Sequence, residues 1–569
     1  MAESRDSQLA LLGEEFFQIQ NTIDPLSTTL LGIPGYDGLL PDPSRDGARR
    51  GAARLLDIER RVARLDVGSL SPVDEIDAAV LARLAGGARG DLEEGIWEAD
   101  ASSEGYASPH AMVFMCVPAV VVSSDEVAQT YLTRLSGLGD YFDAITERYA
   151  QAQVGGRFST RAGIARAIDQ LRGHLALEIS EDLLANPPLG SGFDAGAFVD
   201  EARSSVLGSA RPAISRLAHL LAGEMTERAR DDEHVGIRFV PGGEAAYATA
   251  VRRHTTTSLS PDEIHQVGLD RVAQLQSEWS ELGSRVLGER DVATILSRLR
   301  EDPALRFETS AQIVKVAEDC LDRAELARDA WFPPYRIASC VVEEVHPVEA
   351  RNAALAHYRP PATDGSRPGA HCILTLNPEK RFRYEYEALS FHESTPGHHL
   401  QIAIAQTLTD LPRYRRYLDA QVGAFVEGWG LYAEGLADEM GLYSSDLTRL
   451  GMLSFDALRA CRLVVDTGMH HLGWSRGRAI AYMCENTATT ETNVANEIDR
   501  YIGWPGQALS YMIGRREIQR LRRYATDRLG DAFDVRDFHA TVLSSGAVPL
   551  DVLATLVDKW IARRAGSAV

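Results

Sequence analysis

Histidine and glutamate are concentrated in one short segment of the chain, ALSFHESTPGHHLQ at 388–401. It holds three of the chain's 15 histidines within eight residues, and Glu393 directly follows the first of them, His392. Zinc is bound by neutral imidazoles and carboxylates in a tetrahedral array, and a catalytic site keeps one position open for water. A free carboxylate nearby can take the proton of that water. These residue types predict a zinc site with Glu393 as general base; a histidine cluster that holds no metal is the alternative.

The spacing of the histidines differs from that of an ordinary HExxH helix, where the two ligands lie one turn apart. On a straight helix, His398 would lie about 240° around and about 9 Å along the axis from His392. His399 would share the face of His392 but lie about 10.5 Å away. Two nitrogens about 2.0–2.1 Å from one zinc cannot be that far apart. Pro396 removes a backbone donor and Gly397 is permissive, so we expect the helix to break there and one of the two later rings to turn back.

A second acidic segment, FVEGWGLYAEGLADEMG at 425–441, follows this one. Glu427 and Glu434 are seven residues apart and therefore share a helix face. Glu427 comes 35 residues after His392, and over that distance a second helix can return and offer a carboxylate. The two glycines that follow Glu427 are poor helix formers, but they would let a backbone or a metal come close. Glu434 could orient a histidine ligand. For both glutamates, a solvated position on the helix surface is the alternative.

Six stretches of the chain resemble a family of uncharacterised bacterial proteins catalogued as domain of unknown function 885. They are HYRPPATDGSRPG, ALSFHESTPGHHLQ, FVEGWGLYAE, VDTGMHHLGWSRGRAIAYM, PGQALSYMIGRREIQRLR and FHATVLSSGAVPLDVL, with weaker similarity reaching LGIPGYDGLLPD near the start. That family is similar to the gluzincin metallopeptidases, notably thimet-type oligopeptidases and thermostable carboxypeptidases. In those enzymes a His-Glu helix is followed by a second helix, which carries a ligand glutamate and another acid seven residues on.

The resemblance implies a metal ligand set. It implies one zinc ion held by His392, His398 and Glu427, because the GH pair of the peptidases aligns with Gly397 and His398 here. The chain departs from the peptidases by two extra residues between Glu393 and that pair.

Further functional residues follow from the C-terminal motifs. Because peptidases of this kind stabilise the oxyanion with a phenol, the resemblance implies Tyr511 in that role. It also implies that His470 donates a hydrogen bond to the substrate or the intermediate. The alternatives are a packing role for Tyr511 and a core position for His470. Arg515, one turn after Tyr511, could bind a substrate carboxylate through a bidentate contact or form a surface salt bridge. The segment at 372–378 could be an edge strand that pairs with an extended peptide.

The rest of the chain reads as mainly helical. Between 331 and 380, β-branched runs bounded by Pro, Gly and Asn predict short strands around a turn-rich loop at 360–369. Caps are marked by SSDE at 123–126 and SPDE at 260–263. Apolar residues recur at helical spacing in 124–150, 160–185, 195–230 and 261–300, and again from about 384 to 525.

We therefore predict a mainly α fold with a two-lobed, helical, metallopeptidase-like architecture and a small β-sheet beside the active-site cleft. The expected division is a helical N-terminal lobe at 1–330 and a catalytic part at 331–569. A chain of 569 residues is too long for one simple core, because single cores stop growing at about 250–300 residues.

Composition limits the partners. The chain has 59 basic and 81 acidic side chains, a formal charge of −22. An acidic surface repels phosphate backbones, so we expect no nucleic-acid partner.

Six scattered cysteines without a CxxC motif are typical of buried residues in a reducing compartment. The start, MAESRDSQLALLGEEFF, has no basic region followed by an apolar run, and no stretch reaches about 18 apolar residues. These features predict a cytoplasmic protein without a membrane partner.

Together these patterns predict a zinc-dependent hydrolase, most simply a peptidase that cleaves small peptides. A zinc amidase or esterase acting on a non-peptide substrate would use the same metal chemistry. A non-catalytic helical scaffold that keeps only the relic of a metal site is a third hypothesis.

Overall fold

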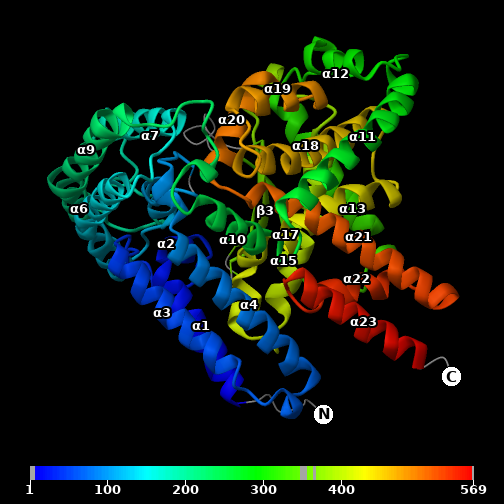
Figure 1. Ribbon diagram of the computed structural model, residues 1–569, viewed down its shortest axis with the longest axis horizontal. Helices are drawn as coiled ribbons and strands as arrows, with labels where there is room; N and C mark the ends of the chain where they lie inside the picture. Colours follow the sequence, from blue (N-terminus) through cyan, green and yellow to red (C-terminus); the bar gives the residue numbers. More distant parts are fainter. Residues whose placement is uncertain (1–6, 105, 346–354, 363–364, 366, 567–569) are drawn as a thin grey trace. The chain divides into compact units, whose positions relative to one another are not determined.

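Helices make up most of the computed structural model, which describes residues 7–104, 106–345, 355–362, 365 and 367–566 (Figure 1). The chain forms two compact units, and each combines segments that are distant in sequence. Unit 1 comprises Met1–Ala250, Gly468–Ala479 and Asn496–Pro505, and unit 2 comprises Val251–Thr467, Ile480–Ala495 and Gly506–Val569. The sequence-based division instead placed a single boundary at residue 330, and it stays a prediction about how the chain is organised.

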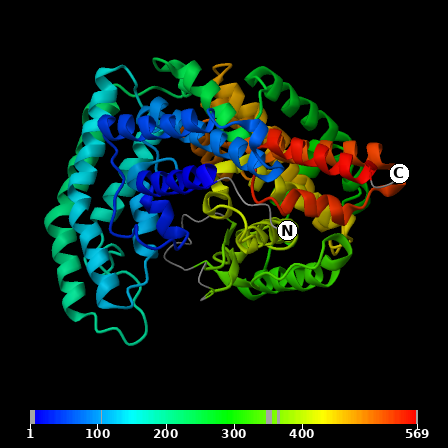
Figure 2. The ribbon, with the colours of Figure 1, turned by 90° about the horizontal axis from the view of Figure 1, so that it is seen from below.

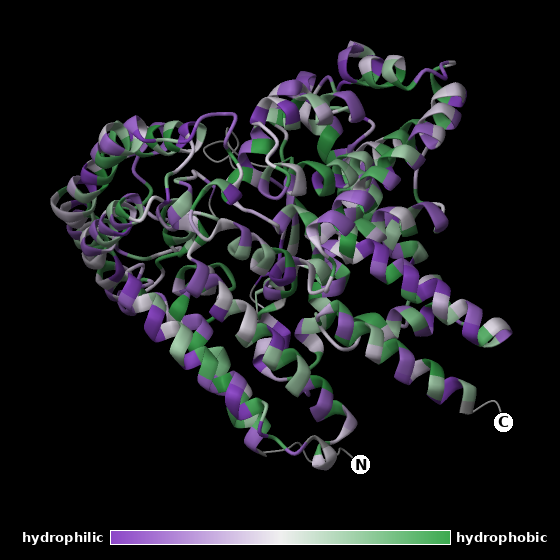
Figure 3. Ribbon diagram, in the orientation of Figure 1, coloured by the Kyte–Doolittle hydropathy of each residue, from purple (hydrophilic) through white to green (hydrophobic). Residues whose placement is uncertain are grey.

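Unit 1 is built on helices. Its elements are α1 (Ser7–Ile23), α2 (Pro25–Leu30), α3 (Arg45–Val62), α4 (Pro72–Glu94), α5 (Pro109–Cys116), α6 (Asp125–Val154), α7 (Arg161–Leu175), α8 (Gly196–Ser205), α9 (Arg211–Leu220) and the first part of α10 (Gly243–Thr255). The long helix α6 packs along α9 in both views (Figures 1 and 2). Phe142 and Ile145 of α6 and Ile214 and Leu217 of α9 are fully buried in one shared core. Each of these helices carries both apolar and polar residues, so that it can turn an apolar face to the core and a polar face to solvent (Figure 3).

Unit 2 holds the remaining helices and the sheet. Its elements are α11 (Pro261–Val286), α12 (Val292–Glu301), α13 (Ser310–Trp331), β1 (Cys340–Glu344), β2 (Ala356–Arg359), β3 (Gly369–Ile373), α14 (Tyr386–Glu393), α15 (His398–Thr407), α16 (Arg413–Tyr417), α17 (Gly423–Glu439), most of α18 (Asp446–His470), parts of α19 (Arg476–Asn486) and α20 (Glu491–Gly503), α21 (Ser510–Leu529), α22 (Val535–Leu543) and α23 (Leu550–Gly566). The mainly helical class with a small sheet is confirmed.

The helix starts follow the local signals. Ser124 accepts a hydrogen bond from the backbone N–H of Val127, and Ser260 forms a complete capping box with Glu263. The stretch of helical spacing at 261–300 contains two helices, α11 and α12. The chain turns between them at Gly288, whose φ of +67° suits glycine.

The sheet has three strands in the order β1-β3-β2, with β1 parallel and β2 antiparallel to β3. All five residues of β3 are buried. The expectation of a peptide-binding edge strand at 372–378 is therefore wrong. Cys372 and Ile373 belong to the central strand, whose backbone groups are paired on both sides, and the residues after Ile373 lie outside the strand.

Two bulk expectations concern cysteines and membranes. All six cysteines are free thiols; four are buried, while Cys340 and Cys484 are partly exposed. Within the described residues, no helix combines the length and the apolar character that crossing a membrane requires.

Candidate metal centre

The helix breaks where the sequence predicts a break. Helix α14 ends at Glu393, α15 begins at His398, and the Thr395–Pro396 bond between them is cis. A Cβ at Gly397 would collide with the carbonyl oxygen of His392, so this close return of the chain requires glycine. As a result, the rings of His392 and His398 lie 4.6 Å apart between centroids and nearly perpendicular, at 86°.

The adjacent histidine turns elsewhere. Nδ1 of His399 is 3.0 Å from the hydroxyl of Tyr358 on β2, and the ring packs against Gly369 of β3. Burial lowers the pKa of His399 to about 4. Of the two alternatives for the second histidine, His398 is the one that lies beside His392.

Glu427 of α17 completes a three-residue cluster. Its Oε2 lies 3.6 Å from Nε2 of His392 and 3.6 Å from Nε2 of His398. The three ligand atoms all lie within 4.8 Å of one another. For bonds of about 2.0–2.1 Å and tetrahedral angles, ligand atoms around zinc are about 3.3–3.4 Å apart. The donor set, two imidazoles and a carboxylate, suits zinc, and the two 3.6 Å separations that involve Glu427 are within a few tenths of an ångström of this spacing.

Two glycines of α17 allow this approach. A Cβ at Gly430 would lie 2.6 Å from Cε1 of His392, so the imidazole rests directly on the helix backbone. A Cβ at Gly428 would lie 2.5 Å from Cα of Gly514, where α17 and α21 cross in close contact. The expectation that small residues here admit a neighbouring backbone is confirmed.

Glu434 contacts the second nitrogen of His392, Nδ1, which faces away from Glu427. Its Oε1 lies 2.8 Å from Nδ1 of His392, in a fully buried contact. A donated Nδ1–H leaves Nε2 free to face Glu427, which is how carboxylates orient histidine ligands. The contact that the sequence suggested for Glu434 is therefore present.

The pKa values of His392 and Glu427 are shifted in opposite directions by their mutual contacts. Burial disfavours the imidazolium of His392, but its hydrogen bonds to Glu427 and Glu434 outweigh burial and raise the pKa of His392 to about 9. Burial alone would raise the pKa of Glu427, yet the hydrogen bonds to His392 and His398 hold that pKa well below its usual value. The site thus favours a carboxylate facing a positive centre, which either a proton or a metal cation can supply.

Glu393 and Tyr511 also lie at the cluster. Glu393 is buried at the end of α14, directly after His392, and its charge acts on His392 and on His371 of β3. The ring of Tyr511 lies nearly parallel to that of His392, with centroids 6.4 Å apart. The structure therefore brings His392, Glu393, His398, Glu427 and Tyr511 together.

Two arginines that the sequence reasoning missed surround Tyr511. The guanidinium of Arg462 lies 4.5 Å and that of Arg459 lies 5.7 Å from the centroid of its ring, and Arg459 is also 3.7 Å from Glu434. The signal was present, because two arginines three residues apart interrupt an otherwise apolar stretch of α18.

Arg515 has a protein partner for its bidentate contact. Its two terminal nitrogens lie 2.7 and 2.9 Å from the carboxylate oxygens of Asp456, which also receives Arg271. The alternative of a salt bridge describes its geometry, although the pair is largely buried rather than on the surface. Its predicted role in substrate binding stays a prediction without a contact that supports it.

His470 belongs to unit 1 and has core contacts there. Its Nδ1 accepts from the backbone N–H of Ile237 at 3.0 Å, and its Nε2 lies 3.0 Å from the carbonyl oxygen of Tyr501. Burial lowers the pKa of His470 to about 4, so the ring is neutral. Both nitrogens are engaged by the backbone, as in a core histidine, and the predicted catalytic role gains no support from this geometry.

The chain belongs to the family described as bacterial protein of unknown function (DUF885), which matches residues 25–557. The family expected from the sequence is thereby confirmed. A crystal structure of a candidate lipoprotein from Colwellia psychrerythraea is similar, with a TM-score of 0.89 and 27% identity over 98% of this chain and 99% of that one. A candidate lipoprotein of unknown function from Shewanella oneidensis shares the fold, with a TM-score of 0.74 and 19% identity over 97% and 100%. No curated protein matches the chain.

Proposed function

We propose that this protein is a zinc-dependent hydrolase, most simply a peptidase that cleaves small peptides. The observation that carries the proposal is the convergence of His392, His398 and Glu427, with Glu393 beside them. Two imidazoles and one carboxylate leave a fourth tetrahedral position free, which distinguishes a catalytic zinc site from a closed structural one. The resemblance to gluzincin peptidases and their two-lobed helical architecture belongs to the same proposal.

Each residue of the cluster has a role in this reaction. Bound zinc would polarise the substrate carbonyl and make water acidic enough to act as nucleophile near neutral pH. Glu393 accepts the proton of the attacking water and returns it to the leaving group. Glu434 fixes the ring of His392 so that Nε2 faces the site. In this proposal Tyr511, whose ring contacts with His392, Arg459 and Arg462 support a place at the site, donates from its hydroxyl to the developing oxyanion.

The decisive test combines metal content with catalysis. Untagged protein should contain about one zinc per chain, and a peptide-library digest read by mass spectrometry should show cleavage that a chelator abolishes. Cleavage of amides or esters but of no peptide would favour the amidase or esterase alternative. Protein that is folded and zinc-loaded but inert towards all three would support the non-catalytic scaffold.

The base is tested by Glu393→Gln, which keeps the volume of the side chain but cannot accept a proton. Zinc content and melting temperature should be unchanged, because no metal ligand is removed. Hydrolysis should fall by about 10²–10⁴-fold, the usual contribution of a positioned acid or base. A variant with full zinc, an unchanged melting temperature and nearly normal hydrolysis would remove Glu393 from the mechanism.

The cellular location is part of the proposal as well. We propose a cytoplasmic protein without a membrane or nucleic-acid partner, and the formal charge of −22 supports the last of these points, because an acidic surface repels phosphate backbones. The two similar solved structures are of proteins described as candidate lipoproteins, a description that does not suit the cytoplasm. Cell fractionation of the native protein decides between these locations.

A further inference from the structure

The two candidate histidine ligands differ in what their second ring nitrogen contacts. Nδ1 of His392 has Oε1 of Glu434 at 2.8 Å. Nδ1 of His398 is buried as well, but it has no hydrogen-bond partner among the described residues. The Nε2 atoms of the two rings are alike, because both lie 3.6 Å from Oε2 of Glu427. One ligand of the candidate centre therefore has an orienting partner, and the other lacks one.

The second partner matters because it decides the tautomer of His398. A neutral imidazole carries one proton, and a metal ligand must carry it on the nitrogen that faces away from the metal. For His398 that nitrogen is Nδ1. A buried N–H without an acceptor costs about 1–3 kcal/mol, so the proton is favoured on Nε2 instead, where Oε2 of Glu427 can accept it. An acceptor for Nδ1 would reverse this preference and leave Nε2 free for zinc.

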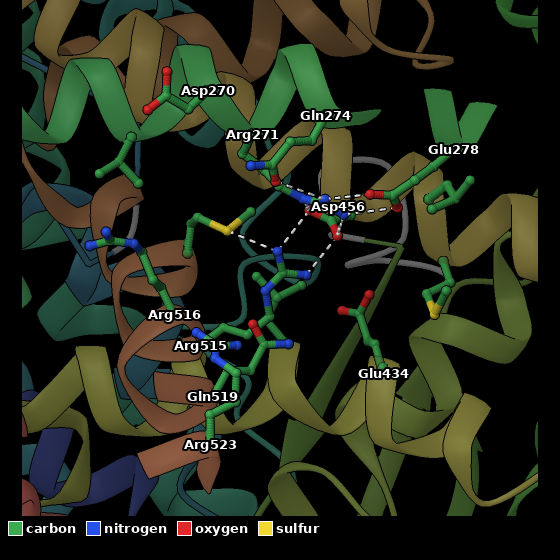
Figure 4. A pocket seen from close by; sticks show the side chains of 16 residues that line it. Asp270, Arg271, Gln274, Glu278, Glu434, Asp456, Arg515, Arg516, Gln519 and Arg523 are labelled. Carbon is green, nitrogen blue, oxygen red and sulfur yellow. Dashed lines mark hydrogen bonds and ion pairs between the residues drawn. The ribbon is translucent and has the colours of Figure 1, made fainter. Parts of the chain in front are cut away.

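Few oxygens are available as that acceptor. Among the buried side-chain oxygens that the structure describes in unit 2, only Oε1 of Gln401 and Oε2 of Glu434 have no hydrogen-bond partner. Glu434 already orients His392, and it lies in the wall of a cavity between α11, α17, α18 and α21 (Figure 4). His398 does not line that cavity. Gln401 is thus the acceptor left for His398.

Gln401 occupies a suitable place on α15. It lies three residues after His398, and residues three apart on a helix have Cβ atoms about 5–6 Å apart. Helical side chains lean towards the N-terminus, so that of Gln401 extends back over the turn that begins with His398. The residue is only 1% exposed, and neither its Nε2 nor its Oε1 has a partner among the described residues. Two unsatisfied polar groups therefore share one buried turn of the helix.

We propose that Gln401 is the positioning residue of His398, and that its Oε1 accepts the Nδ1 proton when the centre binds zinc. The role parallels that of Glu434 towards His392. The inference rests on the proposed zinc site, because a bound metal is what requires this tautomer. A rotation of the Gln401 side chain within one turn of α15 forms the contact.

Gln401→Met separates this role from a packing role. Metal-free Gln401→Met should be at least as stable as the unaltered protein, because an apolar side chain of similar length replaces a buried amide without partners. Its zinc affinity should nevertheless fall by about 10–100-fold, the range for loss of a partner that orients a metal ligand. The measurements are a melting curve after dialysis against chelator and competition for zinc with a chromophoric chelator. A residue that only packs would show a lower melting temperature and unchanged zinc affinity.

Two further variants complete the experiment. Gln401→Glu keeps an oxygen at the same reach, so its zinc affinity should equal or exceed that of the unaltered protein, since carboxylates are common partners of histidine ligands. Gln406→Met is the matched control on the same helix. Gln406 donates to the carbonyl oxygen of Pro361 at 3.2 Å and follows His398 by eight residues, about 12 Å along the axis. It should keep full zinc affinity.

Three results would overturn the proposal. They are unchanged zinc affinity in Gln401→Met, the same loss in Gln406→Met, or a loss in folded Gln401→Glu as large as in Gln401→Met. The proposed hydrolase function survives each of these results, because zinc binding and hydrolysis by the unaltered protein do not depend on their outcome. If the unaltered protein binds no zinc, the metal centre itself is refuted, and this inference is refuted with it.

Discussion

The contact between Gly430 and His392 offers a sharp test of the candidate metal centre. In Gly430→Ala the added Cβ would lie 2.6 Å from Cε1 and 2.8 Å from Nε2 of the imidazole. Ordinary contacts begin at 3.4 Å, so the ring would have to move by about 0.8 Å. The helix cannot yield instead, because Gly428 already packs on the backbone of Gly514. A shift of that size is about four times the ±0.2 Å tolerance of a metal–ligand distance.

Zinc affinity should therefore fall in Gly430→Ala by about 10–100-fold, the range seen when the support of a metal ligand is disturbed. The assay is competition with a chromophoric chelator at constant pH, together with a melting curve of each variant. Gly435→Ala is the matched control on the same helix, because no atom lies within 4 Å of its added Cβ. It should keep zinc and gain stability, since alanine is favoured over glycine in a helix by about 0.5–1 kcal/mol. Zinc affinity within twofold of the unaltered protein in Gly430→Ala would refute the placement of His392.

Two further predictions follow from the same geometry and from a buried acid nearby. His398→Ala should lose zinc while His399→Ala largely keeps it, measured as metal per folded chain; the reverse would show that the other ring turns inward. Burial raises the pKa of Glu385 to about 7, from an ordinary 4.5. Because this folded-state pKa is raised, the contribution to stability is full below pH 4.5 and is lost as pH rises through about 7, about 3 kcal/mol in all. Glu385→Gln cannot ionise, so its melting temperature should fall less between pH 5 and 8 than that of the unaltered protein; equal falls would contradict the raised pKa.

The features that the sequence predicted well are those set by neighbouring residues. A cap such as Ser260 with Glu263 acts over three residues, and the structure contains it. The break after Glu393 follows from Pro396 and Gly397, whose effect on the backbone is local. The family itself was recognisable because its motifs are contiguous in sequence.

The features that the sequence did not reveal depend on partners far along the chain. Strand β2 was not recognised, because its four residues, AHYR, carry little β-branched signal. The short run that includes Cys372 suggests a strand but does not tell whether that strand is central or at an edge. The partner of Arg515 is Asp456, 59 residues earlier, and the contacts of His470 are with Ile237 and Tyr501. None of these pairings has a local signature.

The segment EGWGLYAE shows how residues that the sequence presents separately act as one unit. Gly430 lies three residues after Glu427 and four before Glu434, so all three share one helix face. The imidazole of His392 rests on this glycine and offers one nitrogen to each glutamate. Gly430 sets how closely the His392 ring approaches the backbone of α17, and the two carboxylates set the orientation of the ring. A change at any of the three positions therefore displaces the same Nε2 atom.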